Sequence, residues 1–437
     1  MNSFRITKGH NLKLSGIPSE TLLDTEAPCS VFFHPSSIKN IKTKLLVKEG
    51  DSIQVGSPLF CDKKNEQVLF VSSCSGRVKK IQFGPRRIVE IIEIENDKKN
   101  TSFVNLDRNL NKESFLKSGL WPYLRQKPYS KIPHYSINPK SIYISAMPTE
   151  PFALNYEYLM NETNNSIQSG INALSKIFDC EINLISSNNT IFSKLVNVKH
   201  YNFNKLHPAG NVGVQMHHIN PIKDGEDVRF YLSLQDLSRI GDFFDGNQYP
   251  NSRYISIGGN GMTNQGIYKV LIGTSIKNII ASNLSDDVQI ISGDVLNGKV
   301  TIKDRSLNFH DEVLSVIQND NKREFLGWLM PGFKKYTLTR AFFSRLLNNK
   351  GSELSTKKNG SVRTIIPMGN WDRVMPMNIM SEYLVKSILA NDIDMMEKLG
   401  IYECSPEDFS LCAFICQSKV EVSRIIENGL DLMENEG

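Results

Sequence analysis

Two glycine-rich stretches of this 437-residue chain come nearest, in residue type and spacing, to the chemistry of cofactor binding. HPAGNVGV carries Gly210 and Gly213, and ISIGGNGMT carries Gly258, Gly259 and Gly261 directly after a strand pattern. A glycine-rich turn between a strand and a helix can point its N–H groups at a pyrophosphate. Neither stretch is followed by a clear helix and an acid about 20 residues later, as a dinucleotide fingerprint requires. We expect turns that need a positive φ, with ligand-facing loops as the alternative.

The cysteines and histidines lack the spacing of a metal site. A four-iron cluster needs about four thiolates, usually three of them in a CxxCxxC run. The C-terminal region offers Cys404, Cys412 and Cys416, with seven and three residues between them, and we interpret the last two as buried thiols on one face of a helix. A metal shared with the cysteines of another chain is the alternative. His217 and His218 are adjacent, so on a strand they would point to opposite faces.

Motifs for other chemistry are also missing. No HxH, HExxH or GxSxG motif occurs, and no paired carboxylates suggest acid/base catalysis. Seven cysteines, an odd number at irregular spacings, indicate reduced thiols. We therefore predict no catalytic residue and no metal ligand in this chain.

Composition and charge describe a soluble globular protein. Hydrophobic residues make up 40% and charged residues 22% of the chain, with a mean hydropathy of -0.29. No apolar run approaches the roughly 18 residues that span a bilayer, and the N-terminus lacks the apolar part of a secretory signal, so we expect a cytoplasmic location. The net charge of +5 comes from dispersed basic residues, which argues against nucleic-acid binding. The densest basic patch is a solvated hairpin face or, alternatively, a docking site for acidic partners or lipid headgroups: Arg77, Lys79, Lys80, Arg86 and Arg87.

The elements that must position these residues fall into four regions, and we predict an α+β or α/β multidomain fold. Residues 1–104 are strand-rich, and residues 105–254 alternate strands with helices, as in a Rossmann-like α/β domain. Residues 255–325 read as a small β-rich, β-grasp-like module. Residues 326–437 form a connector and a C-terminal helical region, in which Gly400 ends the first helical pattern.

Turns in the first region suggest a relationship. An EGD turn, a VGSPL turn and an SGRV turn follow one another, an order similar to the barrel-sandwich hybrid of lipoyl and biotinyl carrier domains. Carriers are modified on a lysine at a hairpin tip, and Lys63 or Lys64 is near that position. No flexible linker follows, so we expect a β unit that packs on its neighbours, with a modified carrier as the alternative.

Ordered motifs along nearly the whole chain resemble the NqrA family, the NqrA subunits of the Na(+)-translocating NADH:quinone reductase. The resemblance is carried by FLGWLMPGFKKYTLTR (325–340), GNWDRVMPMNI (369–379), LCAFICQSKVE (411–421), SGLWPYLRQKPYSKIP (118–133), ISAMPTEPFA (144–153), HPAGNVGV (207–214) and SGDVLNGK (292–299).

This resemblance implies a peripheral subunit on the cytoplasmic face of the bacterial inner membrane. The complex would oxidise NADH, reduce ubiquinone to ubiquinol and export Na(+), as a translocase. FAD, FMN, riboflavin and iron–sulfur centres would lie on the partner subunits B to F. The chain alone would bind no cofactor and show no turnover. The family's α/β domain is similar to the NADH- and flavin-binding subunit of respiratory complex I, so a retained flavin or NADH site is the alternative function.

Aromatic residues of the connector are the candidates for a quinone environment. Trp328, Phe333 and Tyr336 flank a Pro-Gly pair, and a quinone site needs aromatic walls and donors to its carbonyl oxygens. We expect instead that they pack into a core. A surface that docks on a hydrophobic partner would use the same residues.

Overall fold

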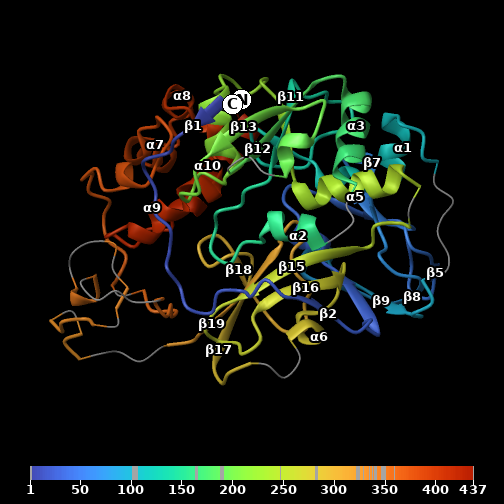
Figure 1. Cartoon of the computed structure of the whole chain (residues 1–437), viewed down its shortest axis with the longest axis horizontal. Helices are drawn as coiled ribbons and strands as arrows, with labels where there is room; N and C mark the ends of the chain where they lie inside the picture. Colours follow the sequence, from blue (N-terminus) through green and yellow to red (C-terminus); the bar gives the residue numbers. More distant parts are fainter. Residues whose placement is uncertain are drawn as a thin grey trace.

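The computed structural model of the chain contains three β-containing domains and a helical C-terminal region (Figure 1). It describes residues 2–100, 107–162, 166–187, 191–246, 248–280, 284–320, 325–327, 329–333, 335–336, 338, 342–345, 351–358 and 360–436. No helix among these residues is long and apolar enough to cross a bilayer.

Two small antiparallel sheets form the N-terminal β unit. The first has the order β3-β9-β8-β5 and the second β4-β6-β7. The predicted turns at Gly50 and Gly56 lie between these strands, and Gly76 begins β8 at φ +148°, where a Cβ would meet the carbonyl oxygen of Glu95 at 1.8 Å, so only glycine fits. The strands are β3 (Ser30–Phe33), β4 (Thr43–Leu45), β5 (Ser52–Ile53), β6 (Pro58–Asp62), β7 (Asn65–Val71), β8 (Gly76–Phe83) and β9 (Val89–Asn96).

A six-stranded sheet is the centre of the α/β domain, in the order β1-β13-β12-β11-β14-β10. β11, β12, β13 and β14 are parallel to one another, and β10 is antiparallel to β14. β1, from the N-terminal segment, pairs in parallel with β13 at the edge of the sheet. The strands are β1 (Asn2–Phe4), β10 (Arg125–Lys127), β11 (Ser141–Ser145), β12 (Glu181–Ser186), β13 (Lys199–Phe203) and β14 (Arg229–Ser233).

Both faces of this sheet are buried, as is usual for parallel strands. Ile142 and Ile144 belong to one core, shared with α3 and α5, whereas Tyr143 belongs to a second core, shared with α4 and the C-terminal helices. Strand alternation explains the division, because successive side chains point to opposite faces. The helices of the domain are α1 (Lys112–Lys117), α2 (Tyr156–Glu162), α3 (Ile167–Phe178), α4 (Val212–Ile219) and α5 (Leu234–Phe244).

The third module is a mixed sheet in the order β18-β17-β19-β15-β16-β2. Its first strand after the α/β domain, β15, begins at Ser252, slightly before the expected start of the module. Its edge strand β2 comes from the N-terminal segment and pairs with β16. The elements are β2 (Leu22–Asp24), β15 (Ser252–Gly258), β16 (Gly266–Leu271), α6 (Ile276–Ile280), β17 (Val288–Ser292), β18 (Lys299–Thr301) and β19 (Val313–Gln318).

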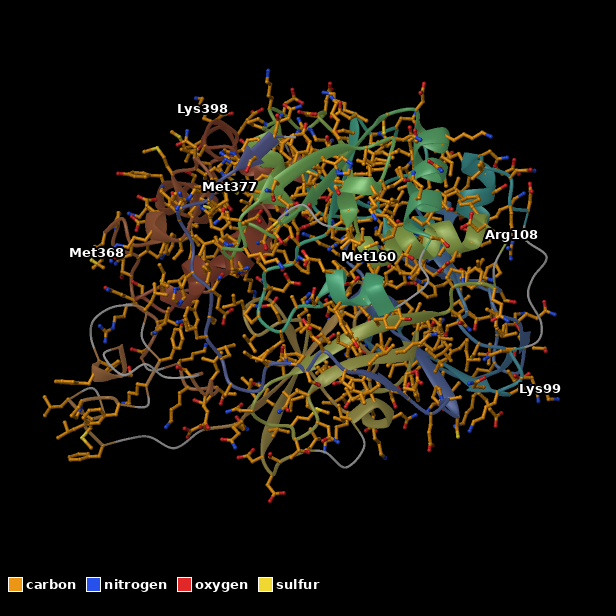
Figure 2. The ribbon with its side chains drawn as sticks, in the orientation of Figure 1. Lys99, Arg108, Met160, Met368, Met377 and Lys398 are labelled. Atoms are coloured by element: carbon orange, nitrogen blue, oxygen red, sulfur yellow. The ribbon has the colours of Figure 1, made fainter. Side chains whose placement is uncertain are left out.

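The C-terminal region packs its helices against the α/β sheet. The predicted helical pattern up to Gly400 is divided at Asn391, whose φ of +55° ends α7 before α8 begins. Figure 2 shows Met368 at the outer edge of this region, and Met377 is buried within it. The helices are α7 (Ser381–Leu389), α8 (Ile393–Lys398), α9 (Ser410–Ile415) and α10 (Val422–Glu436).

Candidate functional site at the domain junction

The carboxyl ends of β11 and β14 define the place where a sheet of this kind usually binds ligands. The strand order reverses there, because the chain adds β12 and β13 on one side of β11 and β14 on the other. Ser145 ends β11 and Ser233 ends β14. Ligands of open α/β sheets bind in the crevice beyond such strand ends.

Side chains of the third module enter this crevice. Tyr156 of α2 donates a hydrogen bond to Glu312, which directly precedes β19. Arg253 of β15 places Nη2 3.9 Å from Glu312 Oε1 and 4.0 Å from Asp236 Oδ1 of α5. Ser233 also interacts with the Glu312 carboxylate. The crevice is therefore filled by the chain's own charged groups.

Burial and neighbouring charges shift the ionisation of these groups. Burial, followed by the charge of Asp236, raises the pKa of Glu312, and Arg253 opposes the shift. Burial and the neighbouring Asp294 raise the pKa of Glu150, in the loop after β11, to about 7. Burial also raises the pKa of Asp294 to about 6. The junction thus contains acids that titrate near neutral pH, a frequent property of functional sites.

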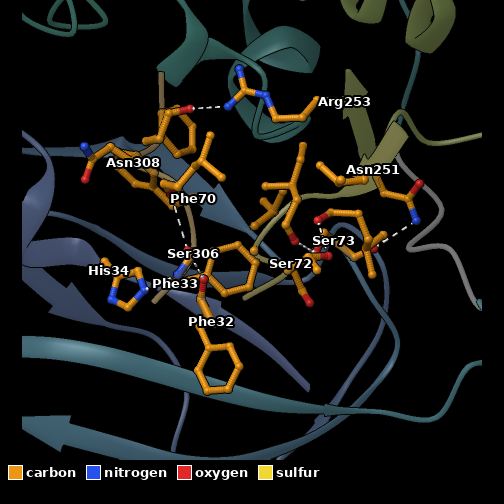
Figure 3. Close-up of a pocket in the computed structure, with 18 of the residues that line it drawn as sticks. Phe32, Phe33, His34, Phe70, Ser72, Ser73, Asn251, Arg253, Ser306 and Asn308 are labelled. Atoms are coloured by element: carbon orange, nitrogen blue, oxygen red, sulfur yellow. Dashed lines mark hydrogen bonds between the residues drawn. The ribbon is translucent and has the colours of Figure 1, made fainter. Parts of the chain in front are cut away.

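A small cavity of about 60 Å³ lies where the N-terminal unit meets the other two domains (Figure 3). Its walls include Phe70, whose ring lies 5.5 Å from that of Phe309, and Tyr123, which stacks on Phe309 at 4.7 Å. Arg253 donates from Nη1 to the Phe309 carbonyl at 2.8 Å, and its Nε and Nη2 have no hydrogen-bond partner. This volume is well below the roughly 300 Å³ at which small-molecule pockets usually begin.

The expected positive φ is wrong for the first glycine stretch, because neither Gly210 nor Gly213 has one and Gly213 lies in α4, a helix that the sequence did not reveal. The stretch is packed against the chain itself. Gly210 donates its N–H to Thr149 Oγ1 at 2.9 Å, and Thr149 Oγ1 also lies 3.1 Å from His207 Nδ1. A Cβ on Gly213 would lie 2.1 Å from Asp408 Oδ2. The Asp408 carboxylate therefore occupies the space beside the start of α4, where a helix would otherwise favour a bound anion.

Asp408 belongs to a buried ion pair that sequence reasoning missed. Lys127 Nζ lies 3.5 Å from Asp408 Oδ2 and also contacts Ser405, and both charged side chains are fully buried. The pair joins β10 to the C-terminal region across 281 residues of sequence. Neither residue stands in a motif for ion binding or catalysis, so the sequence carries no local signal for their contact.

In the second glycine stretch the expected positive φ is confirmed for Gly259 and wrong for Gly258 and Gly261, and all three are close-packed. A Cβ on Gly258 would lie 2.5 Å from the Phe152 ring, and one on Gly259, at φ +118°, would lie 2.0 Å from the Val316 carbonyl oxygen. A Cβ on Gly261 would lie 2.8 Å from the Val288 side chain and 3.0 Å from the Val316 side chain. These contacts account for the three glycines without a ligand.

Of the connector's aromatic candidates the structure describes Phe333 and Tyr336, whose rings are not in contact, and the expected packing into a core is wrong for Phe333, which is 54% exposed. The ring of Phe333 lies 5.8 Å from the ring of Phe343. Tyr336 instead contacts His10 and lies 5.5 Å from the ring of Phe414. Burial raises the pKa of Tyr336 to about 12. Trp328 lies outside the described residues.

The histidine pair lies on a helix and not on a strand, so the expected opposite directions of the two side chains do not apply. His217 and His218 are in α4, with ring centroids 5.3 Å apart. His217 Nδ1 lies 2.7 Å from Glu403 Oε2, and its Nε2 accepts from the N–H of Asn378 at 3.0 Å. Among the described residues, no group of three or more His, Cys, Asp or Glu side chains could hold a metal ion.

The C-terminal cysteines are buried. α9 ends at Ile415, so Cys412 lies within the helix and Cys416 directly follows it. Burial raises the pKa of the Cys412 thiol well above its usual value. Such a thiol is a poor nucleophile.

Lys63 and Lys64 form the two-residue turn between β6 and β7, so the expected hairpin tip is present. Both side chains are exposed. Asn65 anchors the hairpin by donating from Nδ2 to the Pro133 carbonyl at 3.2 Å, which ties the tip to the α/β domain.

Comparison with known proteins matches three family models to successive parts of the chain. They are described as the NqrA N-terminal barrel-sandwich hybrid domain (residues 4–97), the NqrA second alpha/beta domain (106–248) and the NQRA C-terminal domain (254–302). An NAD+-reducing [NiFe]-hydrogenase aligns with 73% of this chain and 60% of its own, at 10% identity and a TM-score of 0.41, which is too low to bear on the fold.

Curated relatives match over almost the entire length. Proteins named as the NqrA subunit of the Na(+)-translocating NADH-quinone reductase are 31% identical in Vibrio atlanticus, 30% in Marinomonas sp. and 32% in Yersinia pestis. Each alignment covers 99% of this chain and 99% or 100% of the relative. The chain therefore belongs to the NqrA family of Na(+)-translocating NADH-quinone reductase subunits.

Proposed function

We propose that this chain is a peripheral subunit of a Na(+)-translocating NADH-quinone reductase that docks on the membrane subunits at the cytoplasmic face. The partner subunits B to F would hold the flavins and iron–sulfur centres and would carry the Na(+) path. The chain itself would show no turnover. Full-length similarity to proteins named as NqrA subunits supports this proposal.

The observation that carries the docking proposal is the apolar surface of the connector. Phe325 is 91% exposed, Leu329 67% and Met330 60%. Phe333 and Phe343 are also more than half exposed. In Figure 1 this orange segment lies at the lower left, apart from the sheets. Monomeric proteins rarely leave so many large apolar side chains in water, and such surfaces usually contact a protein or a membrane.

The filled crevice supports docking over the alternative of a retained NADH or flavin site. The order β13-β12-β11-β14 corresponds to the first four strands, 3-2-1-4, of a dinucleotide-binding sheet of order 3-2-1-4-5-6 and supports the Rossmann-like assignment. Glu312 and Tyr156 occupy the crevice beyond its strand ends. A negatively charged pyrophosphate would have to displace a carboxylate there and, at the start of α4, a second one from Asp408.

A quinone environment is the second candidate, favoured by the exposed pair Phe333 and Phe343. Their rings, 5.8 Å apart, supply an aromatic wall on the docking surface. A quinone ring held by the membrane subunits would be covered from this side. In the assembled complex, Phe333→Ser would then raise the KM for quinone and leave the KM for NADH unchanged.

Docking is tested by an affinity pull-down of the tagged full chain from gently solubilised membranes of its native host. The triple variant Phe325→Ser, Leu329→Ser, Met330→Ser removes apolar side chains from the connector. The double variant Val300→Ser, Ile302→Ser is the matched control, because these residues are 64% and 60% exposed elsewhere on the surface. We expect the membrane subunits to be recovered with the wild type and the control but lost with the triple variant.

Equal recovery with all three proteins would contradict docking through the connector. Recovery of the wild-type chain alone, from membranes in which other respiratory complexes stay intact, would contradict membership of the complex itself.

A further inference from the structure

A second cavity, of about 180 Å³, lies at the junction of all three β-containing domains. It is larger than the aromatic cavity, and most of its lining residues carry a hydroxyl, amide or basic group. The charged and polar residues of the lining include Lys39, Arg125, Ser130, Lys131, Lys299, His310 and Asp311.

Arg125 is the most informative residue of this cavity. It lies on β10 opposite Tyr231 of β14, and this register places its guanidinium 4.6 Å from the centre of the Tyr231 ring. Arg125 Nε is buried and has no hydrogen-bond partner. No described acid lies within ion-pair distance of the guanidinium. Arg125 is half-buried, and although burial disfavours its charge, Tyr231 and Glu407 keep the pKa of the guanidinium raised, so an anion in the cavity would meet a charged group.

The other charges of the lining leave the cavity positive. Lys39 pairs with Asp431 at 3.1 Å and Lys131 pairs with Glu434, but Lys299 makes no ion pair among the described residues. Asp311 is the acid of the lining, and it already accepts hydrogen bonds from Ser292 Oγ at 2.7 Å and Asn308 Nδ2 at 2.8 Å.

His310 adds another unused group. Its Nδ1 is buried without a hydrogen-bond partner. Burial and the charges of Arg125 and Arg253 lower the pKa of His310 well below its usual value, so the ring is neutral at pH 7 and one nitrogen can donate without adding charge.

We propose that this cavity binds a phosphate group, either as free phosphate or as part of a small phosphate ester. Arg125 would supply the planar fork of donors that suits phosphate oxygens, with Lys299 at the rim and the Ser130 hydroxyl and His310 ring beside it. The volume equals that of about six liquid water molecules, enough for one phosphate group with a small substituent. It is too small for a dinucleotide or a flavin. The proposal does not depend on the docking function.

Isothermal titration calorimetry of the purified full chain tests the site. One titration uses inorganic phosphate, a second uses glycerol 3-phosphate, and sodium chloride of equal ionic strength controls for screening. We expect saturable binding of at least one phosphate compound. A lower Kd for the inorganic ion would identify free phosphate as the ligand, and a lower Kd for glycerol 3-phosphate would identify an ester.

The Arg125→Gln variant should weaken binding roughly tenfold or more, because it removes a charged donor from a buried site. Lys299→Gln should weaken binding less, since Lys299 is exposed, and this rim position also keeps the test valid if Arg125→Gln does not fold. Lys303→Gln, an exposed lysine outside the cavity lining, is the matched control and should bind as the wild type does. No saturable heat beyond that of chloride, or an unchanged Kd in folded Arg125→Gln and in Lys299→Gln, would overturn the proposal.

Discussion

At the scale of single residues, the domain junction contains acids whose pKa in the folded protein differs from that in the unfolded chain. Glu150 is the clearest case, because burial and Asp294 raise its pKa to about 7 in the folded protein. In the unfolded chain the same carboxyl would titrate near its ordinary pKa of 4.5. Folding therefore takes up a proton between these two pH values.

The sign of the resulting pH dependence follows from proton linkage. Between about pH 4.5 and 7 the folded state binds more protons at Glu150 than the unfolded state, so the free energy of unfolding falls as pH rises. Part of the residue's surface still reaches solvent, which screens the effect, and we expect the group to cost about 2 kcal/mol at pH 8 relative to pH 4.5. Glu150→Gln, which cannot ionise, should flatten this part of the profile and be more stable than the wild type at pH 8.

Urea unfolding of both proteins at several pH values measures this difference, with Glu157→Gln, at a partly exposed acid of α2, as the control. If Glu150→Gln and the wild type lose stability in parallel from pH 5 to 8, the carboxylate of Glu150 is not the source.

At the scale of elements, α3 and α5 approach each other closely because glycines face the contact. A Cβ on Gly241 of α5 would lie 1.9 Å from the Ser166 carbonyl oxygen, and one on Gly170 of α3 would lie 2.3 Å from the Leu237 carbonyl oxygen. These obstacles are backbone atoms, so a side chain at either glycine requires the helices to move apart.

Gly241→Ala should therefore destabilise the protein by about 1 to 3 kcal/mol, the usual cost of overpacking. Helix propensity alone predicts the opposite, a gain of about 1 kcal/mol from replacing a helical glycine with alanine. Gly225→Ala is the control, because the nearest atom to its Cβ is the Tyr129 side-chain oxygen at 3.2 Å. Denaturant unfolding decides between the two signs, and a stabilised Gly241→Ala would show that the helices can separate freely.

Elements with strong local patterns could be predicted from the sequence. The turns at Gly50 and Gly56 lie between strands of the N-terminal unit, and Gly76 begins β8. The helix that runs into a β-branched strand is α3 followed by β12. The helical region after residue 380 was also expected, although Asn391 divides its first part.

Contacts between distant residues could not be predicted in this way. β1 and β2 have three residues each, and their partners lie about 200 residues away or more, so neither has a pattern of its own. For the same reason the sequence does not predict that Glu312 lies in the crevice or that Lys127 pairs with Asp408. Each contact depends on how complete domains pack. The sequence gives no clear signal for α4, because its eight residues are too few to distinguish a helical period from that of a strand.

At the scale of the whole molecule, the N-terminal segment joins the α/β domain, the connector and the third module by backbone hydrogen bonds. β1 pairs with the α/β sheet, Ser15 donates to the carbonyl of Ser352 in the connector, and β2 pairs with the third module. Between these strands Ile17 is exposed, so the backbone there is accessible. The segment therefore couples the stability of several domains.

Cutting this segment should uncouple the domains. A protease site placed at Ile17 and cleaved after folding leaves residues 2–16 held by non-covalent contacts alone. Scanning calorimetry should show one unfolding transition in the uncut protein and two in the cleaved protein after the fragment dissociates. The uncut variant is the control for the inserted site, and one unchanged transition after complete cleavage and fragment removal would contradict the coupling.

The long reach of β1 also has a consequence for synthesis on the ribosome. β1 is made first, yet its partner β13 ends at Phe203, so the strand waits while about 200 residues are added. At ~5–20 residues per second this delay is roughly 10 to 40 s. During that time β1 has no sheet to join. Pairing of β1 with the α/β sheet therefore follows translation of β13, which gives chaperones a defined interval in which to bind this strand.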